Sequence, residues 1–263
     1  MNFQELQDKK DYLNGLRPFS KEELMQIKKE VILSNTYSRN NSYSRKYAPD
    51  ALTDEEKISI IENDGKLPIM SNSSHFELGG IYIAYESIIY KVEEENKPPY
   101  FRWWSVDHKT IKNMNSIVLD YYVRYLPCNN PGNGRGQYRH ANGKLKDRKL
   151  PSREAFLPMI DSLLRWYHQT DKDFFTKLAI FHLIFLDEIH PFVDGNGRTA
   201  RMLMNTELAL NGYPMIGLKH SNGEIYDTAF DVFRESGDYS LMLSLIYNNV
   251  NQQLNAHIDL KKK

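Results

Sequence analysis

The feature that most constrains this chain is a polar turn set between two long apolar runs. Residues 178–189 read LAIFHLIFLDEI and residues 202–210 read MLMNTELAL, and both runs favour buried helices. The turn between them, residues 190–201, reads HPFVDGNGRTAR. Pro191 and Gly195 oppose one continuous helix. The pattern therefore predicts two buried helices joined by a short polar loop.

This loop has the composition of an anion site. The second helix is expected to begin near Asn196, where the first backbone N–H groups lack intrahelical partners and the helix dipole is positive. Gly195 and Gly197 allow a ligand to approach the backbone closely. Arg198 and Arg201 are three residues apart and share one helix face, so they would repel each other unless an anion lies between them. A di- or triphosphate would meet that need.

Two further residues indicate phosphate chemistry. Asp194 would add negative charge to a phosphate site, which is favourable if it holds Mg²⁺, an ion that takes one or two carboxylates together with phosphate oxygens. His190 precedes the turn and could accept a proton near neutral pH. Each residue also has a structural interpretation: a histidine at a helix end, a Gly-Asn-Gly turn, arginines on a solvated face. Solvated arginines would nevertheless be out of place between two apolar helices.

The rest of the chain predicts a mainly α-helical fold with one small hairpin. Ser20 and Glu23 form a capping-box pattern, and Thr53 can cap a second helix. Residues 127–149 are rich in Gly, Asn and basic side chains, and the pair Asn142-Gly143 favours a tight hairpin turn. Helical patterns cover residues 20–33, 53–63, 75–92, 107–125, 152–169, 172–189, 196–211, 225–236 and 238–258.

Composition narrows the class of protein. The chain has 263 residues, with 34 basic and 34 acidic side chains, and this zero net charge argues against a general nucleic-acid binder. Cys128 is the one cysteine, so no intrachain disulfide can form, as suits a reducing cytoplasm. No window approaches the roughly 20 apolar residues of a membrane span. We expect a soluble, cytoplasmic protein without a membrane partner.

The twelve residues HPFVDGNGRTAR resemble the signature H-P-F-x-D-G-N-G-R-x-x-R of the Fic (Fido) family at every fixed position. Residues 136–139, Gly-Gln-Tyr-Arg, resemble the element that precedes the family's flap hairpin. The resemblance implies a Fic-type helical bundle with a small β-hairpin flap. It divides the chain into an N-terminal helical segment at 1–106, a Fic core at 107–215 and C-terminal helices at 216–263.

The resemblance also implies a protein adenylyltransferase that uses ATP and Mg²⁺ to modify a Ser, Thr or Tyr hydroxyl of a protein substrate, itself included. His190 would be the catalytic base, and Phe192 would anchor the loop. Asp194 would hold the metal, and the Asn196 side chain would steady the α-phosphate. The implied phosphate-binding residues are Gly195, Asn196, Gly197, Arg198 and Arg201. Tyr138 and Arg139 would belong to the flap region that docks the target.

Many Fic proteins are restrained by a glutamate that pairs with the second motif arginine. Residues 34–40 resemble that inhibitory motif, but Ser38 stands where the glutamate would be. Glu62, followed by Asn63, is a second candidate, although Ile58 occupies its Ser/Thr position. The alternatives left open are removal of AMP, transfer of another nucleotide, a non-enzymatic regulator that senses a nucleotide or DNA, and a protein with a vestigial site. A homodimer is also left open.

Overall fold

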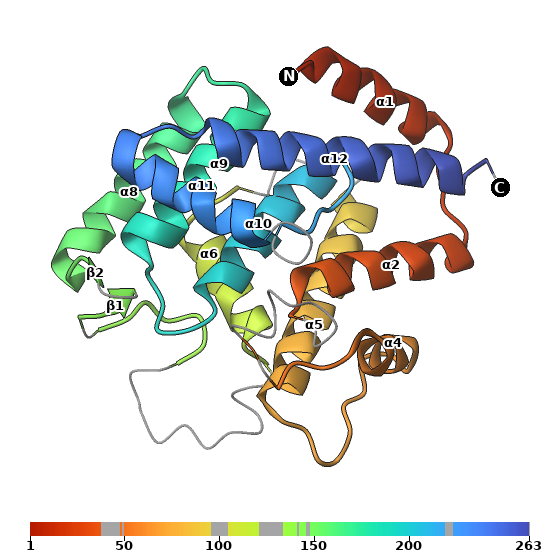
Figure 1. Ribbon diagram of the computed structural model, residues 1–263, viewed down its shortest axis with the longest axis horizontal. Coiled ribbons are helices and arrows are strands. Elements are labelled where there is room, and N and C mark those ends of the chain that lie inside the picture. Colours follow the sequence, from red (N-terminus) through yellow and green to blue (C-terminus); the bar gives the residue numbers. More distant parts are fainter. Residues whose placement is uncertain are drawn as a thin grey trace.

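The computed structural model describes residues 1–37, 48, 50–95, 105–120, 134–140, 142–145, 148–218 and 223–262. It is mainly α-helical, as the sequence predicts (Figure 1). In chain order its elements are α1 (Phe3–Gly15), α2 (Lys21–Asn35), α4 (Asp54–Glu62), α5 (Ser73–Glu95), α6 (His108–Val118), β1 (Lys144–Leu145), β2 (Arg148–Lys149), α8 (Arg153–Gln169), α9 (Phe174–Leu183), the π-helix η2 (Ile184–Ile189), α10 (Asn196–Leu210), α11 (Gly223–Ser236) and α12 (Ser240–Leu260).

Local sequence signals account for several helix starts. Ser20 and Glu23 form the predicted capping box of α2, each bonding to the backbone of the other. Thr53 and Glu56 do the same for α4. The helices predicted from residues 20 and 53 are therefore confirmed at their first turns. Helix α1 was not predicted, and it lies alongside α12, so that the first and last helices of the chain are neighbours (Figure 1).

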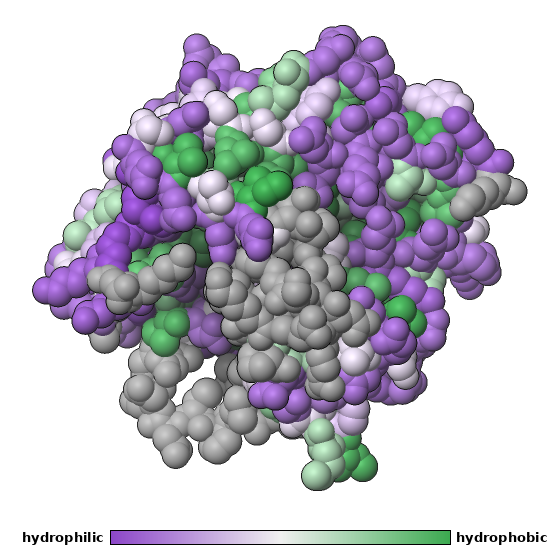
Figure 2. All heavy atoms as spheres, in the orientation of Figure 1, coloured by the Kyte–Doolittle hydropathy of each residue, from purple (hydrophilic) through white to green (hydrophobic). Residues whose placement is uncertain are grey.

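Helix α10 lies at the centre of the bundle. It packs against α5, α6 and α9, and its side chains are buried on nearly every face. Buried apolar residues from the N-terminal segment, the predicted core and the C-terminal helices join in one hydrophobic cluster. Hydrophilic side chains cover much of the outer face along α12, with hydrophobic ones visible between them (Figure 2). This packing buries most of the first turn of α10, including Asn196, Arg198 and Arg201.

The small hairpin is present, but its turn differs from the prediction. Strands β1 and β2 are antiparallel, with Lys144 opposite Lys149 and Leu145 opposite Arg148. The connection between them falls at residues 146–147, which lie outside the described residues. Asn142 and Gly143 precede β1 and do not join the strands, and the Gly143 carbonyl accepts a bond from the Leu150 N–H at 2.9 Å. The prediction that the hairpin turn falls at Asn142-Gly143 is therefore wrong.

Candidate active site

The polar loop begins where α9 gives way to the wider π-helical turn η2. The His190 N–H donates to the Phe185 carbonyl at 3.0 Å, five residues back, and His190 itself takes a left-handed conformation with φ 45°. Pro191 follows and cannot continue the helix. A π-turn of this kind is frequent at functional sites. It turns the chain so that the His190 side chain lies beside the start of α10.

The Asn196 side chain closes the loop from within. Its Oδ1 accepts the Phe192 N–H at 2.9 Å, and its Nδ2 donates to the Phe192 carbonyl at 2.8 Å. Asn196 is buried, as is the Phe192 ring, which anchors the loop in the core as expected. The expectation that the Asn196 side chain contacts an α-phosphate does not fit these bonds. Asn196 instead shapes the loop that would present backbone N–H groups to a ligand.

Gly195 has a backbone conformation that explains its residue type. Its φ of 78° is left-handed, and a Cβ built there would lie 3.1 Å from the Asn115 Nδ2. Asn115, from α6, donates to the Asp194 carbonyl at 3.0 Å and to the Thr199 Oγ1 at 3.2 Å. It therefore ties the loop to the first turn of α10. Asn115 was not predicted, because nothing in the local sequence of α6 points to a partner about 80 residues away.

His190 is held in one orientation and kept neutral. Its Nδ1 lies 2.8 Å from the Leu186 carbonyl, which can only accept, so Nδ1 carries the proton and Nε2 is the basic nitrogen. Burial lowers the pKa of His190 below its ordinary value, and the nearby charges of Arg139 and Arg148 lower it further, although the bond to Leu186 acts in the opposite direction. The imidazole is thus ready to accept a proton at neutral pH.

Arg139 holds the backbone around His190. Its side chain donates to the His190 carbonyl at 2.9 Å and to the Pro151 carbonyl at 2.6 Å. Its own N–H donates to the Pro191 carbonyl at 2.9 Å. Tyr138 is also buried, and its hydroxyl lies 2.9 Å from His108 Nδ1. The prediction that Tyr138 and Arg139 dock a target is corrected: both are inaccessible, and they support the loop from behind.

The two motif arginines have different surroundings. Arg198 donates to Asp194 at 3.1 Å, and Glu77 of α5 lies 3.9 Å away. Asp194 is the more accessible partner, with its side chain 60% exposed. One exposed carboxylate beside a helix N-terminus is consistent with a Mg²⁺ ion that arrives with a nucleotide, because phosphate oxygens and water complete its coordination. In the described part of the chain, no group of three or more His, Cys, Asp and Glu side chains forms a ready-made metal site.

Arg201 reaches toward the end of α2. Its Nη2 donates to the Asn35 carbonyl at 3.4 Å, and it lines the cavity together with Tyr226. The Tyr226 hydroxyl lies 2.7 Å from His182 Nε2. Burial lowers the pKa of His182 to about 3, with a further contribution from Arg201, so His182 is neutral. Tyr226 and His182 therefore form a hydrogen-bonded pair near Arg201 that the sequence alone did not reveal.

Of the two inhibitory candidates, Glu62 is the one that the structure describes. Glu62 ends α4 and forms an ion pair with Lys29 of α2, so the structure does not bring it to the motif. Ser38 lies outside the described residues, as does Cys128. The Asn35 contact shows that the end of α2 still reaches Arg201, although through a neutral carbonyl.

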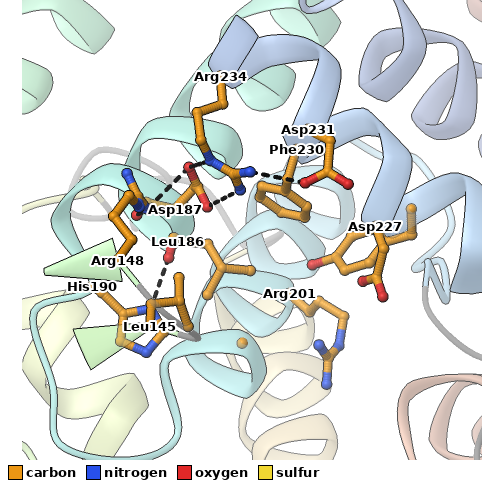
Figure 3. Close-up of a pocket in the computed structure, with 12 residues that line it drawn as sticks. Leu145, Arg148, Leu186, Asp187, His190, Arg201, Asp227, Phe230, Asp231 and Arg234 are labelled. Atoms are coloured by element: carbon orange, nitrogen blue, oxygen red, sulfur yellow. Dashed lines mark hydrogen bonds and ion pairs between the residues drawn. The ribbon is translucent and has the colours of Figure 1, made fainter. Parts of the chain in front are cut away.

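A cavity of about 470 Å³ lies beside the polar loop (Figure 3). His190, Gly197 and Arg201 form one side of the cavity, and α11 contributes Tyr226 and Phe230. The lining is completed by Leu145, Arg148, Leu186, Asp187, Asp227, Asp231 and Arg234. The cavity therefore joins the predicted motif to α11 and to the hairpin.

Asp187 ties three of these elements together. This buried carboxylate accepts two bonds from Arg234 of α11, at 2.8 and 3.1 Å, and pairs with Arg148 of β2 at 3.1 Å (Figure 3). Arg148 also donates to the Asp187 carbonyl. Asp187 was not singled out in the sequence, because it stood within an apolar run. Its position fixes the hairpin and α11 around the cavity mouth.

The fold and the loop define a helical-bundle domain with a glycine-containing turn at the start of a buried helix. Residues 105–208 of this domain match the Fic/DOC family. Among curated relatives, the protein adenylyltransferase Fic of Nematostella vectensis is 31% identical over 130 residues, which are 46% of this chain and 30% of the relative. The protein of the same name from Aedes aegypti is 24% identical over 97% of this chain and 47% of the relative. The chain thus spans less than half the length of these relatives.

Solved structures confirm the fold. A Fic domain-containing signaling protein from Bacteroides thetaiotaomicron superposes with a TM-score of 0.70 at 20% identity, covering 100% of this chain and 97% of that one. Fic-1 from C. elegans gives a TM-score of 0.72 at 19% identity, covering 97% of this chain and 70% of the other. No helix in the described ranges has both the length and the apolar character needed to cross a membrane.

Proposed function

We propose that this protein transfers AMP from ATP to a hydroxyl group of a protein. The observation that carries the proposal is the placement of a neutral His190, its Nδ1 engaged by the Leu186 carbonyl, in one cavity with Gly197 and Arg201 at the start of α10. A base and an anion site within one cavity are what an in-line attack on a phosphate requires. The relatives named protein adenylyltransferase support the same conclusion.

The start of α10 would hold the phosphates of ATP. Gly195 and Gly197 leave the backbone accessible, and Arg198 and Arg201 would contact the β- and γ-phosphates. Arg198 now pairs with Asp194, and a phosphate could take the place of that carboxylate. Asp194 would then be available to a Mg²⁺ ion bound to the same phosphates. When bound, Mg²⁺ offsets the negative charge of the pyrophosphate leaving group.

His190 would act on the incoming hydroxyl. The hydroxyl oxygen forms a bond to the α-phosphorus, while its proton passes to His190 Nε2. The bond between the α-phosphorus and the oxygen that bridges to the β-phosphate breaks, and pyrophosphate leaves with that electron pair. Arg139 would keep His190 in position through its bond to the His190 carbonyl, without touching the reacting atoms.

The hairpin offers a place for the protein target. Strands β1 and β2 form a two-stranded sheet beside the cavity, and Leu145 and Arg148 line it. A sheet of this kind can bind an extended segment by strand addition. The segment would bring its Ser, Thr or Tyr hydroxyl over the cavity, and it could come from another protein or from a second copy of this chain.

Incubation with Mg²⁺ and ATP labelled at the α-phosphate tests the proposal. We expect label in protein from a cell lysate or in the chain itself, and we expect His190→Ala to reduce labelling by roughly 10²- to 10⁴-fold. The matched control is His168→Ala, which changes an exposed histidine on α8 and should label like wild type. Equal labelling by His190→Ala would overturn the catalytic assignment. Competition by unlabelled UTP, CTP and GTP would establish whether AMP is the group preferred.

A further inference from the structure

A second cavity of about 430 Å³ lies away from the motif. It is bounded by α2, α5, α12 and the turn that follows α10, and it shares no lining residue with the active-site cavity. Its walls are mostly apolar, including Leu24, Ile27, Ile89 and Met215. Hydrophobic side chains are visible among hydrophilic ones on the right of Figure 2, in the area of α2 and α12. The size is in the range of small-molecule sites in proteins.

One polar side chain in this apolar wall is His257 of α12. It is 4% exposed, and neither of its ring nitrogens has a hydrogen-bond partner among the described residues. Burial lowers the pKa of His257 to about 4, and the nearby charge of Arg17 contributes, so the ring is neutral at pH 7. A neutral imidazole still has one N–H to donate. Leaving it unsatisfied in an apolar wall is unfavourable unless a ligand supplies an acceptor.

The second polar side chain is Arg17, from the connection between α1 and α2. Burial lowers the pKa of Arg17, and its Nε is buried without a hydrogen-bond partner in the described part of the chain. No carboxylate among the described residues forms an ion pair with it. Its guanidinium lies 5.7 Å from the centre of the Phe19 ring, and the His257 ring lies 5.7 Å from the same centre. Arg17 and His257 therefore flank one aromatic side chain at one part of the cavity.

Lys261 provides a useful comparison at the same place. It also lies against Phe19, at 5.4 Å, but it pairs with Glu23 at 3.0 Å and donates to the Pro18 carbonyl at 2.9 Å. Its charge is thus satisfied within the chain, whereas that of Arg17 is not met by any described carboxylate. The Arg17 guanidinium, which forms no ion pair with a described carboxylate, and the apolar side chains therefore line the same cavity.

We propose that this cavity binds a small amphipathic carboxylate. The apolar part would lie against the side chains of α2 and α5, and the carboxylate would accept bonds from Arg17 and from the N–H of His257. A carboxylate fits better than a phosphate group, because the cavity offers one unpaired cation and one neutral donor. The ligand would contact α2 and the end of α10, the two helices that also meet at Arg201.

Isothermal titration of the full chain with decanoate at pH 7 tests this proposal. We expect saturable binding at one site, weakened about tenfold or more by Arg17→Gln, which removes the charged hydrogen bonds. Arg165→Gln, at an exposed arginine on α8, is the matched control and should bind like wild type. Decanol, which has the same chain without the charge, should show no difference between wild type and Arg17→Gln. No saturable binding to wild type, or equal decanoate affinity of the two proteins, would overturn the proposal.

A second measurement does not depend on whether Arg17→Gln folds. NMR signals of the histidine rings in the wild-type chain should shift for His257 when decanoate is added, the signal being identified by its absence in His257→Gln. The His190 signal should not move, because His190 lines the other cavity. Unchanged His257 signals at saturating decanoate would contradict the assigned site. AMP transfer is not needed for either readout, so this proposal and the proposed function fail independently.

Discussion

The two cavities described above are similar in size and are each lined by a histidine and at least one arginine, yet they are built differently. In the active-site cavity, His190 is bonded through Nδ1 to the Leu186 carbonyl, and Arg201 donates to the Asn35 carbonyl. In the second cavity, His257 has no ring nitrogen bonded within the described residues, and Arg17 forms no ion pair there. The fold orients the histidine and arginine of the first cavity before any ligand binds. The histidine and arginine of the second cavity are only removed from water.

The difference shows what each site can do. A base must point one nitrogen at the reacting group, so its other nitrogen is occupied by the fold and its tautomer is set. A binding site needs donors that the ligand itself will satisfy, so unsatisfied groups are tolerated until the ligand arrives. Preorganisation therefore marks the cavity suited to catalysis, and unsatisfied donors mark the one suited to binding.

The largest effect on AMP transfer is expected when the groups that orient His190 are removed. Arg139→Met takes away the donors to the His190 and Pro151 carbonyls, and a displacement of His190 by about 1 Å would lower kcat for AMP transfer roughly 100-fold. The KM for ATP should change little, because the phosphate-binding residues are untouched. Steady-state kinetics test this, with Arg165→Met as the control. An unchanged kcat would show that Arg139 does not position the base.

A smaller effect is expected where the polar surroundings of Arg201 are changed. Tyr226→Phe keeps the ring but removes the hydroxyl, which lies 2.7 Å from His182 Nε2 in the cavity that Arg201 also lines. The loss of this polar group near the Arg201 guanidinium should raise the KM for ATP by about tenfold, with a smaller change in kcat. Tyr239→Phe, at a partly exposed position beyond α11, serves as the control. A fall in kcat alone, with KM constant, would contradict this effect on nucleotide binding.

The smallest effect is expected on the free energy of unfolding, through His257 in the second cavity. Because the folded state disfavours protonated His257, with its pKa at about 4, the unfolded chain binds the proton more readily, and stability falls as the pH decreases from 6.5 toward 4. This histidine should cost about 1 kcal/mol of unfolding free energy between pH 7 and pH 5.5.

Urea denaturation at the two pH values measures this cost. His257→Phe should lose less stability on acidification than wild type, and at pH 7 it should be at least as stable, because the unsatisfied ring nitrogens are gone. His140→Phe, at an exposed position, should respond to pH like wild type. An identical pH response of wild type and His257→Phe would contradict the buried, neutral state of this ring.

Several parts of the molecule could be predicted because their signals are local. The capping boxes at Ser20 and Thr53 place helix starts through contacts three residues apart. Helix α1 escaped prediction because it buries only Leu6 and Leu13, too few apolar positions to make a pattern. It is placed by packing on α12 at the other end of the chain.

By itself, the sequence determined the mainly helical fold, the polar loop between two buried helices, and the residues of that loop. Its twelve residues carry the proposed base, the glycines and both arginines within one continuous stretch, so short-range chemistry was enough to recognise them. Only the tertiary structure decided how they are held: by Asn115 from α6, by Arg139 behind His190, and by the Asn35 carbonyl beside Arg201. It also brought Arg17 and His257 to one cavity from opposite ends of the chain. Such partners are distant in sequence, and they meet only because burial of the apolar helix faces folds the chain back on itself.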